Sequence, residues 1–489
     1  MTTAEMAPGS PAEGAARLWS ALAARADNIC LRSPTSILTA AQVLERARRA
    51  ADRLERSGAA GGSVIALWRV PVFDAVPSLL GAWSCDLVTY LADAREPAAA
   101  LERQLDDVGA CLLITGDAVT AEPPGAVPVL EAKRLVGSSG AVAMVREHET
   151  PALPAAAATL LRTSGSSGRP KLAVHGLAQH MTAASGAVAA LDLREGDGWM
   201  LALPYHHVGG LSIIFRAILA GSEVMLPDPG QPLAEALMKL EPTHVSLVPT
   251  QLSRLLEAGL APLRRARSVL LGGAALSTSL RQRGLESGVK LAVSYGSTES
   301  TAFMAVTSDP DIVARPRSAG RVLPDRRLEV STEGELRIGG PTLFLGYLDE
   351  GLFRDPRDED GLFSTGDLGR LDDDGVLYVL GRRDRMFISG GENIYPGEIE
   401  AALESMAGIE EAIVVAAPHA EFGRRPIAFL ICEPAGPGRV EIEARLRREL
   451  PGYKIPDAFY RIPDDVSTSR PRVEELLALL ESPSDLQPL

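Results

Sequence analysis

Helix-period and strand-like segments alternate along most of the chain. Residues 40–58 place apolar side chains three and four positions apart and end at a glycine, which predicts an amphipathic helix. Residues 62–68, GSVIALW, then predict a buried strand. The order strand, turn, helix recurs at residues 243–259 and 267–288. This alternation predicts an α/β fold built on mostly parallel, layered sheets.

The pattern changes near residue 370. Residues 370–385 predict a hairpin with an Asp-Gly turn, and residues 395–405 predict a helix with Pro396 in its first turn. Two further strand-like segments and a charged helix follow, at residues 410–418, 424–434 and 441–450. These elements predict a small α+β domain after a larger one.

The length agrees with two domains, because 489 residues exceed what one hydrophobic core normally serves. We expect a disordered N-terminus at residues 1–14, a large N-terminal domain at residues 15–383 and a small C-terminal domain at residues 384–489. No internal repeat is evident.

Composition narrows the class of protein. The net charge of −14 argues against a nucleic-acid partner, and 46% hydrophobic with 23% charged residues is ordinary for a globular protein. Neither a secretory leader nor a long apolar span is evident, so we expect no membrane association. The cysteines are scattered without disulfide or metal spacing, which favours a cytoplasmic protein: Cys30, Cys85, Cys111 and Cys432.

Residues 163–171, TSGSSGRPK, form a loop with few bulky side chains and a lysine at its end. Such a loop lets backbone N–H groups approach a ligand, and Lys171 indicates that the ligand is negative. The spacing does not fit the G-x-x-x-x-G-K-[ST] phosphate loop. Taken alone, the segment is equally typical of a flexible linker.

Four more segments accompany this loop: SYGSTES at 294–300, STGDLGRLDDDG at 364–375, GRRDR at 381–385 and ISGGENIYPGEIE at 388–400. In this order the set resembles the adenylate-forming superfamily, which includes acyl-CoA synthetases, firefly luciferase and the adenylation domains of peptide synthetases. The resemblance covers the chain from about residue 15. It implies a large domain that binds adenylate and acyl group, and a mobile C-terminal domain.

The resemblance implies a reaction in two steps. A carboxylate attacks the α-phosphate of ATP and gives an acyl adenylate and pyrophosphate, and the thiol of coenzyme A then displaces AMP. ATP, or the AMP moiety of the adenylate, coenzyme A and Mg²⁺ are the implied ligands. A carrier protein's phosphopantetheine thiol is the alternative acceptor.

The resemblance also assigns residues to ATP. Lys171 and the loop hydroxyls and N–H groups would hold the β- and γ-phosphates, and the LGGAA segment would place backbone against the adenine and the acyl group. The implied nucleotide-binding residues are Thr163, Ser164, Gly165, Ser166, Ser167, Gly168, Gly272, Gly273, Ala274, Ser294, Tyr295, Gly296, Ser297, Thr298, Asp367 and Arg382.

Several of these have individual roles. Tyr295 would stack on adenine, Thr298 would bind the α-phosphate, and Asp367 would accept hydrogen bonds from the ribose hydroxyls. Arg382 would donate to the ribose or the phosphates. Glu299 offers hard oxygen atoms suited to Mg²⁺; without the motif it would be a solvated surface acid.

A narrower resemblance is to the o-succinylbenzoate–CoA ligases of menaquinone synthesis, carried by LALPYHHVGGLSIIFRAILAG, THVSLVPTQLSRLL and FISGGENIYPGEIE. It places His207 on the segment that gates the acyl pocket and Arg216 near a second substrate carboxylate. Arg216 could equally pair with a protein acid. The expected pocket walls suit an apolar or ring-bearing acid: Tyr205, His207, Phe215, Arg216, Val248, Pro249 and Gly273.

The C-terminus departs from the family. Members that make the adenylate carry a loop ending in Gly-Lys, whose lysine bridges the carboxylate and the α-phosphate. Here Pro471 and Arg472 occupy these positions, and no lysine follows Lys454. A guanidinium does not simply replace an ammonium, so we expect adenylation to be slower by at least about 10²–10³-fold.

The parts for thioester formation are present, namely the expected hinge Asp384 and the tunnel glycines Gly390 and Gly391. We therefore hypothesise a ligase that mainly converts an acyl adenylate, supplied by a separate adenylating enzyme, into acyl-CoA. Such a protein resembles the non-adenylating ligases of platensimycin-group diterpenoid biosynthesis. The alternatives are an ordinary acyl-CoA ligase, in which Arg472 or Lys454 serves, and an inactive nucleotide-binding scaffold.

Overall fold

The structure is a computed structural model of the whole chain. It describes residues 9–96, 98–116, 127–138, 143–146, 150–163, 171–259, 263–274, 276–307, 311–315, 317–389, 392–419, 421–433, 436–462, 473–481 and 486–489. Across these ranges, no helix is both long and apolar enough to cross a membrane.

The first sheet combines strands from residues 64–175 with β18 and β19 from residues 346–354, and has, within the described ranges, the strand order β19-β18-β8-β7-β4-β3-β5-β6. Its central strands, from β7 to β6, are parallel, and β8, β18 and β19 are antiparallel. The strands are β3 (Val64–Trp68), β4 (Val88–Leu91), β5 (Ala110–Thr115), β6 (Val129–Glu131), β7 (Thr159–Thr163), β8 (Lys171–His175), β18 (Gly346–Asp349) and β19 (Leu352–Arg354).

The second sheet is longer, with the described order β16-β17-β20-β21-β15-β14-β13-β12-β11-β9-β10-β1-β2. It is parallel from β13 to β1 and antiparallel in the arm from β13 to β16. The strands are β1 (Ile29–Arg32), β2 (Ile37–Thr39), β9 (Gly198–Met200), β10 (Glu223–Met225), β11 (His244–Leu247), β12 (Ser268–Leu271), β13 (Leu291–Tyr295), β14 (Ala305–Val306), β15 (Gly320–Val322), β16 (Arg327–Val330), β17 (Glu335–Gly339), β20 (Phe363–Leu371) and β21 (Val376–Arg382).

The expected α/β class and the large and small domains are confirmed, with parallel pairing confined to part of each sheet. The arm from β14 to β21 is antiparallel; within it, short turns join β16 to β17 and β20 to β21, which permits antiparallel pairing without a crossover helix. Of this arm, the sequence pattern predicted only the hairpin of β20 and β21.

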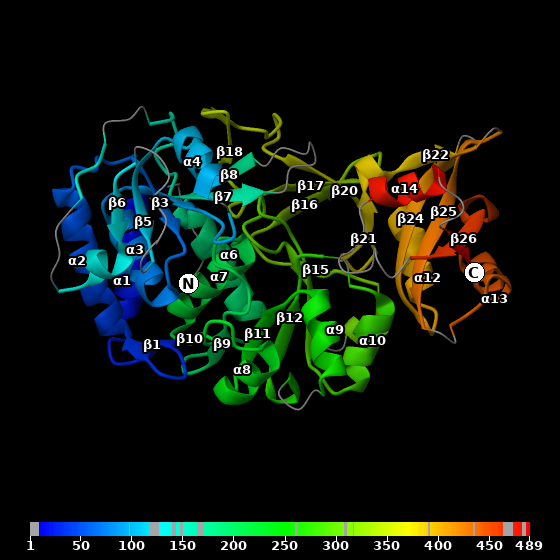
Figure 1. Cartoon of the computed structure of the whole chain (residues 1–489), viewed down its shortest axis with the longest axis horizontal. Coiled ribbons are helices and arrows are strands. Elements are labelled where there is room, and N and C mark those ends of the chain that lie inside the picture. The colour runs from blue at the N-terminus through cyan, green and yellow to red at the C-terminus, as the bar shows by residue number, and fades with distance from the viewer. Residues whose placement is uncertain are drawn as a thin grey trace.

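Helices pack on the sheets (Figure 1), and the helices expected within residues 40–58, 243–259 and 267–288 are α2, α9 and α10. Thr39 and Gln42 form a capping box at the start of α2, and a Cβ on Gly81 of α3 would lie 2.7 Å from the Ala47 carbonyl of α2, so only glycine permits this close packing. The helices are α1 (Pro11–Ala23), α2 (Ala40–Arg56), α3 (Val72–Ser84), α4 (Ala98–Asp107), α5 (Ala132–Val136), α6 (Leu177–Ala190), α7 (Val208–Ala220), α8 (Leu233–Leu240), α9 (Pro249–Glu257), η1 (Leu263–Arg265), α10 (Thr278–Glu286) and α11 (Asp311–Ala314).

The expected disorder of residues 1–14 is wrong for its last part. Residues 1–8 lie outside the described residues, but α1 begins at Pro11, and the Ser10 hydroxyl accepts a hydrogen bond from the Glu13 N–H at 3.4 Å. Ala15, Leu18 and Leu22 of the same helix are buried in the core, and this packing stabilises the helix.

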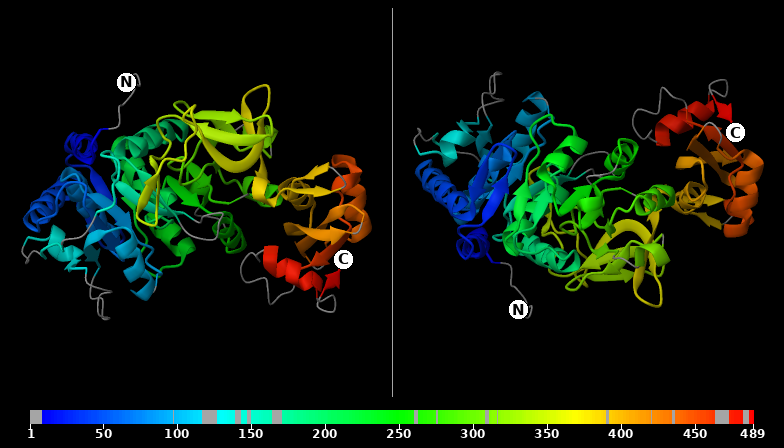
Figure 2. Two further views of the ribbon diagram at one scale, coloured as in Figure 1. Left: turned by 90° about the horizontal axis from the view of Figure 1, so that it is seen from above. Right: turned by 90° about the horizontal axis from the view of Figure 1, so that it is seen from below.

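The C-terminal part has its own four-stranded sheet, in the described order β24-β25-β26-β27, and its own core around Phe459 (Figure 2). A hydrogen bond of 3.0 Å from Arg317 to Glu449 links it to the larger part. The elements are β22 (Phe387–Ser389), β23 (Glu392–Ile394), α12 (Pro396–Glu404), β24 (Ile409–His419), β25 (Gly423–Cys432), α13 (Arg439–Glu449), η3 (Gly452–Lys454), β26 (Ala458–Arg461), α14 (Val473–Glu481) and β27 (Gln487–Pro488).

A short 3₁₀ turn, η2 (Arg383–Arg385), joins the β20–β21 hairpin to the C-terminal part. Arg383 donates to Glu335 of the large sheet at 2.5 Å, and Arg385 donates to Glu400 of α12 at 2.6 Å. The predicted boundary between residues 383 and 384 lies in this turn. One arginine is bound to the large sheet and the other to the C-terminal part. The hinge role of Asp384 stays a prediction.

Candidate active site

A cavity of about 1270 Å³ lies where β8, β12, β13 and the β20–β21 hairpin meet the start of α7. It brings together predicted residues from segments far apart in the sequence. Those that line it are Thr163, Lys171, His207, Arg216, Val248, Gly272, Gly273, Ser294, Gly296, Ser297, Thr298, Glu299, Asp367, Arg382 and Asp384.

Other predicted residues do not line the cavity or are not described. Tyr205 donates its hydroxyl to the Val70 carbonyl at 2.8 Å, Phe215 is buried against His180, and Ala274 is exposed outside the lining. Pro249 starts α9 and is not part of the wall. The predicted residues outside the described ranges are Ser164, Gly165, Ser166, Ser167, Gly168, Gly390, Gly391, Pro471 and Arg472.

The expected ribose site is a hydrogen-bonded triad. Asp367 and Arg382 are register partners on β20 and β21, and Arg382 donates to an Asp367 oxygen at 3.2 Å and to the Thr365 carbonyl at 2.8 Å. The Tyr295 hydroxyl donates to the other Asp367 oxygen at 2.7 Å. The ring of Tyr295 is thereby tied to the acid that was expected to hold the ribose.

Burial decides the protonation behaviour of this triad. Burial, together with the neighbouring Asp367 carboxylate, holds the pKa of Tyr295 well above its ordinary value, so its hydroxyl stays a donor. Burial also raises the pKa of Asp367, although hydrogen bonds from Tyr295 and the charge of Arg382 act in the opposite direction. The carboxylate is therefore held in place by its two donors.

The expected phosphate side also contains Tyr347, which was not predicted from the sequence. Tyr347 of β18 donates to Glu299 at 2.6 Å, and its ring centre lies 5.3 Å from the Lys171 ammonium. Thr163 and Lys171 are register partners on β7 and β8, and both line the cavity. A tyrosine in PTLFLGYLDE gave no signal, because the two site residues that it contacts, Glu299 and Lys171, lie 48 residues away or more in the sequence.

These groups fit Mg²⁺. Glu299 and Thr298 present a carboxylate and a hydroxyl on the same wall, which are the hard oxygen donors that Mg²⁺ prefers. When bound there, the ion would neutralise charge on the phosphates. Lys171 supplies a further positive charge from the protein itself.

Backbone shape explains the glycines of this wall. Gly273, two residues after the end of β12, has φ +80°, a conformation that favours glycine. A Cβ on Gly296 would lie 1.9 Å from the Ala302 carbonyl, so the chain turns tightly under Thr298. Behind this turn, buried His175 lies with its Nε2 2.8 Å from the Thr298 carbonyl, and burial lowers the pKa of His175 to about 4.

The expected acyl side has a different character. Arg216 of α7 is 2% exposed, and its guanidinium lies 5.0 Å from the Trp199 ring and 4.9 Å from the Phe303 ring. Its Nε has no hydrogen-bond partner among the described residues, and the charge that acts on its pKa is the like charge of Arg326. Burial lowers the pKa of Arg216 to about 9.

His207 lies at the N-terminal end of α7, exposed on the cavity wall. A Cβ on Gly210 would lie 2.2 Å from the Pro204 carbonyl, so this glycine lets the helix start against the preceding loop. Four wall residues of this side were not predicted: Arg95 and Phe303 lie outside the segments that carry the resemblance, and Leu203 and Gln251 lie within those segments without an assigned role.

The chain matches two family models. The AMP-binding enzyme model matches residues 18–348, and the AMP-binding enzyme C-terminal domain model matches residues 398–471. The first match alone covers more than half of the 489 residues.

Named relatives and solved structures agree with these matches. A 2-succinylbenzoate–CoA ligase of Bacillus licheniformis is 31% identical over 88% of this chain and 92% of its own. An o-succinylbenzoate CoA synthetase from Bacillus subtilis, in complex with its acyl-adenylate intermediate, superposes with a TM-score of 0.76 at 27% identity, covering 91% of this chain and 94% of its own. The same TM-score and identity hold for that synthetase with ATP and magnesium ion, over 91% of this chain and 95% of its own.

Both domain models, the long alignment and the shared fold lead to the same conclusion. The chain belongs to the family of AMP-binding enzymes, in the adenylate-forming superfamily.

Proposed function

We propose that this protein is an ATP-dependent acid–thiol ligase that carries out both half-reactions and forms an acyl-CoA. In the first, a carboxylate oxygen bonds to the α-phosphorus of ATP and pyrophosphate leaves. In the second, the thiol sulfur of coenzyme A bonds to the acyl carbon, loses its proton, and AMP leaves. The observation that carries the proposal is one cavity with Lys171, Glu299 and Asp367 on its walls.

The walls suggest how the work is divided. Thr163, Lys171 and Thr298 would hold the phosphates, and Asp367 would accept hydrogen bonds from the ribose. Positive charge and donors at the α-phosphate stabilise the charge that develops there as the carboxylate attacks. The comparisons support this version, because relatives over most of the chain are named CoA ligases.

We propose further that the acid carries a second, remote carboxylate. Arg216 is a buried cation in the cavity wall with aromatic neighbours and a free Nε, so an anionic substrate group would satisfy it. The acid in the relatives' name, 2-succinylbenzoate, has two carboxylates and an aromatic ring. The proposed substrate is therefore narrower than the ring-bearing acid expected from the sequence: it is an aromatic dicarboxylic acid.

The test uses purified protein with ATP, Mg²⁺ and coenzyme A. Aromatic acids are offered in pairs that differ only in the second carboxylate, and pyrophosphate exchange and thioester formation are measured separately. We expect both activities, with the dicarboxylic member preferred. Absence of pyrophosphate exchange with every acid would contradict the ATP-dependent proposal, and equal use of both members would contradict the role of Arg216.

The thiolation-biased hypothesis is the second candidate, carried by the absence of a lysine after Lys454. Lys454 itself donates to Glu398 at 2.5 Å, so in this arrangement it is engaged at the C-terminal domain. If this candidate holds, a synthetic acyl adenylate plus coenzyme A gives thioester while ATP plus acid does not. The Pro471→Gly/Arg472→Lys variant then gains adenylation. Failure of both reactions would leave the scaffold alternative.

A further inference from the structure

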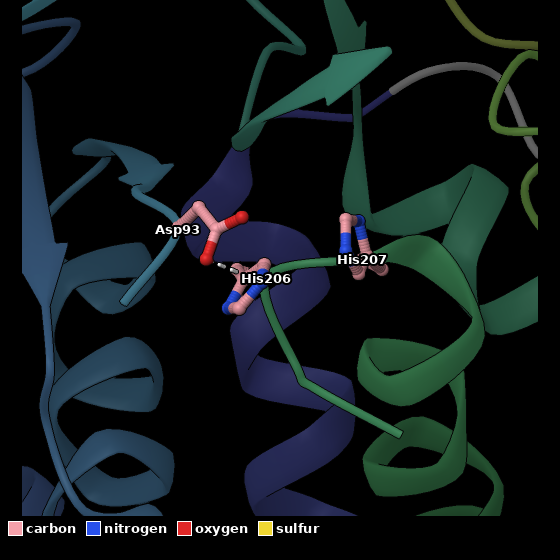
Figure 3. A group of neighbouring side chains, drawn as sticks. All are labelled: Asp93, His206 and His207. Carbon is pink, nitrogen blue, oxygen red and sulfur yellow. Dashed lines mark ion pairs between the residues drawn. The ribbon is translucent and has the colours of Figure 1, made fainter. Parts of the chain in front are cut away.

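Three side chains beside the cavity form a cluster that the proposed reaction does not use as a unit. Asp93 follows β4, and His206 and His207 precede α7 (Figure 3). One ligand atom from each of the three lies within 4.8 Å of the others. The carboxylate of Asp93 faces the imidazole of His206, with Nε2 to Oδ1 at 3.3 Å, and His207 stands beside them.

His206 is buried without a hydrogen bond at Nε2. The residue is 8% exposed, and Nε2 has no hydrogen-bond partner among the described residues although the Asp93 oxygen is near. Buried polar atoms are normally paired, because leaving one unpaired costs the full loss of its hydration. The atom is therefore directed at a space between three groups that could share one ligand.

The spacing suits a metal ion. Metal–ligand bonds of about 2.0–2.1 Å in a tetrahedral site put neighbouring ligand atoms about 3.4 Å apart, close to the separation of Nε2 and Oδ1. His207 is exposed, so a rotation of its side chain can close the remaining distance. Two imidazoles with one carboxylate are donors typical of Zn²⁺ and related ions rather than of Mg²⁺.

We propose that Asp93, His206 and His207 bind a divalent transition-metal ion of the Zn²⁺ type, with water completing the coordination. This site is separate from the Glu299 region, which offers only oxygen atoms. Binding of the ion does not depend on the proposed ligase activity.

Arg95 is compatible with this role. It donates to Asp93 Oδ2 at 2.7 Å, its backbone N–H and Nε donate to Oδ1 at 2.9 and 3.1 Å, and its side chain is 76% exposed. Ligating carboxylates are usually hydrogen-bonded on their outer side. Arg95 can thus keep its hydrogen bond to Oδ2, while Oδ1 exchanges the longer bond from Nε for the ion.

A metal ion bound at this site would affect the acyl side of the cavity through His207. This residue lines the cavity, and an ion would hold its ring toward Asp93. We expect an occupied site to slow the ligase, because the ring could no longer adjust to the acid.

The experiment is a titration of the full-length protein with Co²⁺, without other metals, followed by visible absorption. We expect one Co²⁺ per chain with the intense absorption of a four- or five-coordinate ion, and displacement by Zn²⁺. An ion at Glu299 alone would be six-coordinate and absorb weakly. Weak absorption at saturating Co²⁺ would overturn the proposal.

Substitutions of the proposed ligands test whether these residues bind the ion. His206→Phe should lose the intense band or weaken Co²⁺ binding at least about tenfold, while ligation without the metal continues. The matched control is His419→Ala, which removes an imidazole in the C-terminal sheet and should leave the band unchanged. Asp93→Asn gives a second reading if His206→Phe does not fold. An unchanged band in either folded variant would refute the assignment.

Discussion

The two ends of the cavity differ in how their polar groups are satisfied. At the nucleotide end, Asp367 already receives hydrogen bonds from Tyr295 and Arg382. At the acyl end, Arg216 is buried with a free Nε and no described acid to pair with it. The polar groups of the nucleotide end are therefore satisfied by the protein itself, whereas Arg216 at the acyl end would be satisfied by the substrate. A fold that holds the nucleotide end in place and leaves the acyl end to be completed by the substrate can serve the activation of different acids.

The comparison predicts its largest effect at Asp367. Asp367→Ala removes the acceptor for the ribose and frees Tyr295 and Arg382, and two hydrogen bonds to a charged group are together worth about 3–6 kcal/mol. We expect kcat/KM for ATP to fall about 10²–10⁴-fold in steady-state assays. Asp360→Ala is the control, since Asp360 is 70% exposed and 3.8 Å from Arg337. A loss below fivefold for folded Asp367→Ala would contradict the preorganised ribose site.

Arg216 gives the next largest effect, and a selective one. Arg216→Met keeps much of the volume and removes the charge, so one charge-assisted contact of about 1.5–3 kcal/mol is lost with a dicarboxylic acid. We expect kcat/KM to fall about 10–10²-fold for that acid and to change little for its monocarboxylic partner. Competition between the two acids in one reaction measures the difference directly. Equal losses for both acids would indicate a packing role instead.

The same contact predicts a pH dependence. Burial lowers the pKa of Arg216 to about 9, so the guanidinium is charged below that pH and loses its proton as the pH rises through it. We expect kcat/KM for the dicarboxylic acid to be level below pH 9 and then to fall toward tenfold per pH unit. The Arg216→Met variant should lack this fall. A wild-type profile that stays level to pH 10 would show that the cation persists.

The nucleotide end, apart from Tyr347, was also the more predictable one. Its residues lie in short motifs, such as the SYGSTES segment, in which local backbone shape and ligand contact are set by neighbours in sequence; Gly273 and Gly296 show this directly. Tyr347 and Phe303 reach the cavity through strand pairing and helix packing over long sequence distances, which one sequence does not display. For the same reason Tyr205 was placed in the wall, whereas its hydroxyl donates to the Val70 carbonyl.

The smallest expected effect is that of a substitution at Tyr347. Its hydroxyl donates to Glu299 at 2.6 Å, the carboxylate expected to hold Mg²⁺, so Tyr347→Phe leaves the metal ligand in place but less constrained. Because the other groups of the nucleotide end remain, we expect only about a three- to tenfold rise in the Mg²⁺ concentration for half-maximal pyrophosphate exchange, at constant free ATP. Tyr453→Phe, at an exposed position of the C-terminal part, should leave it unchanged. If Tyr347→Phe instead abolished pyrophosphate exchange, the nucleotide end would depend on this single hydrogen bond. That result would contradict a site held in place by several hydrogen bonds together.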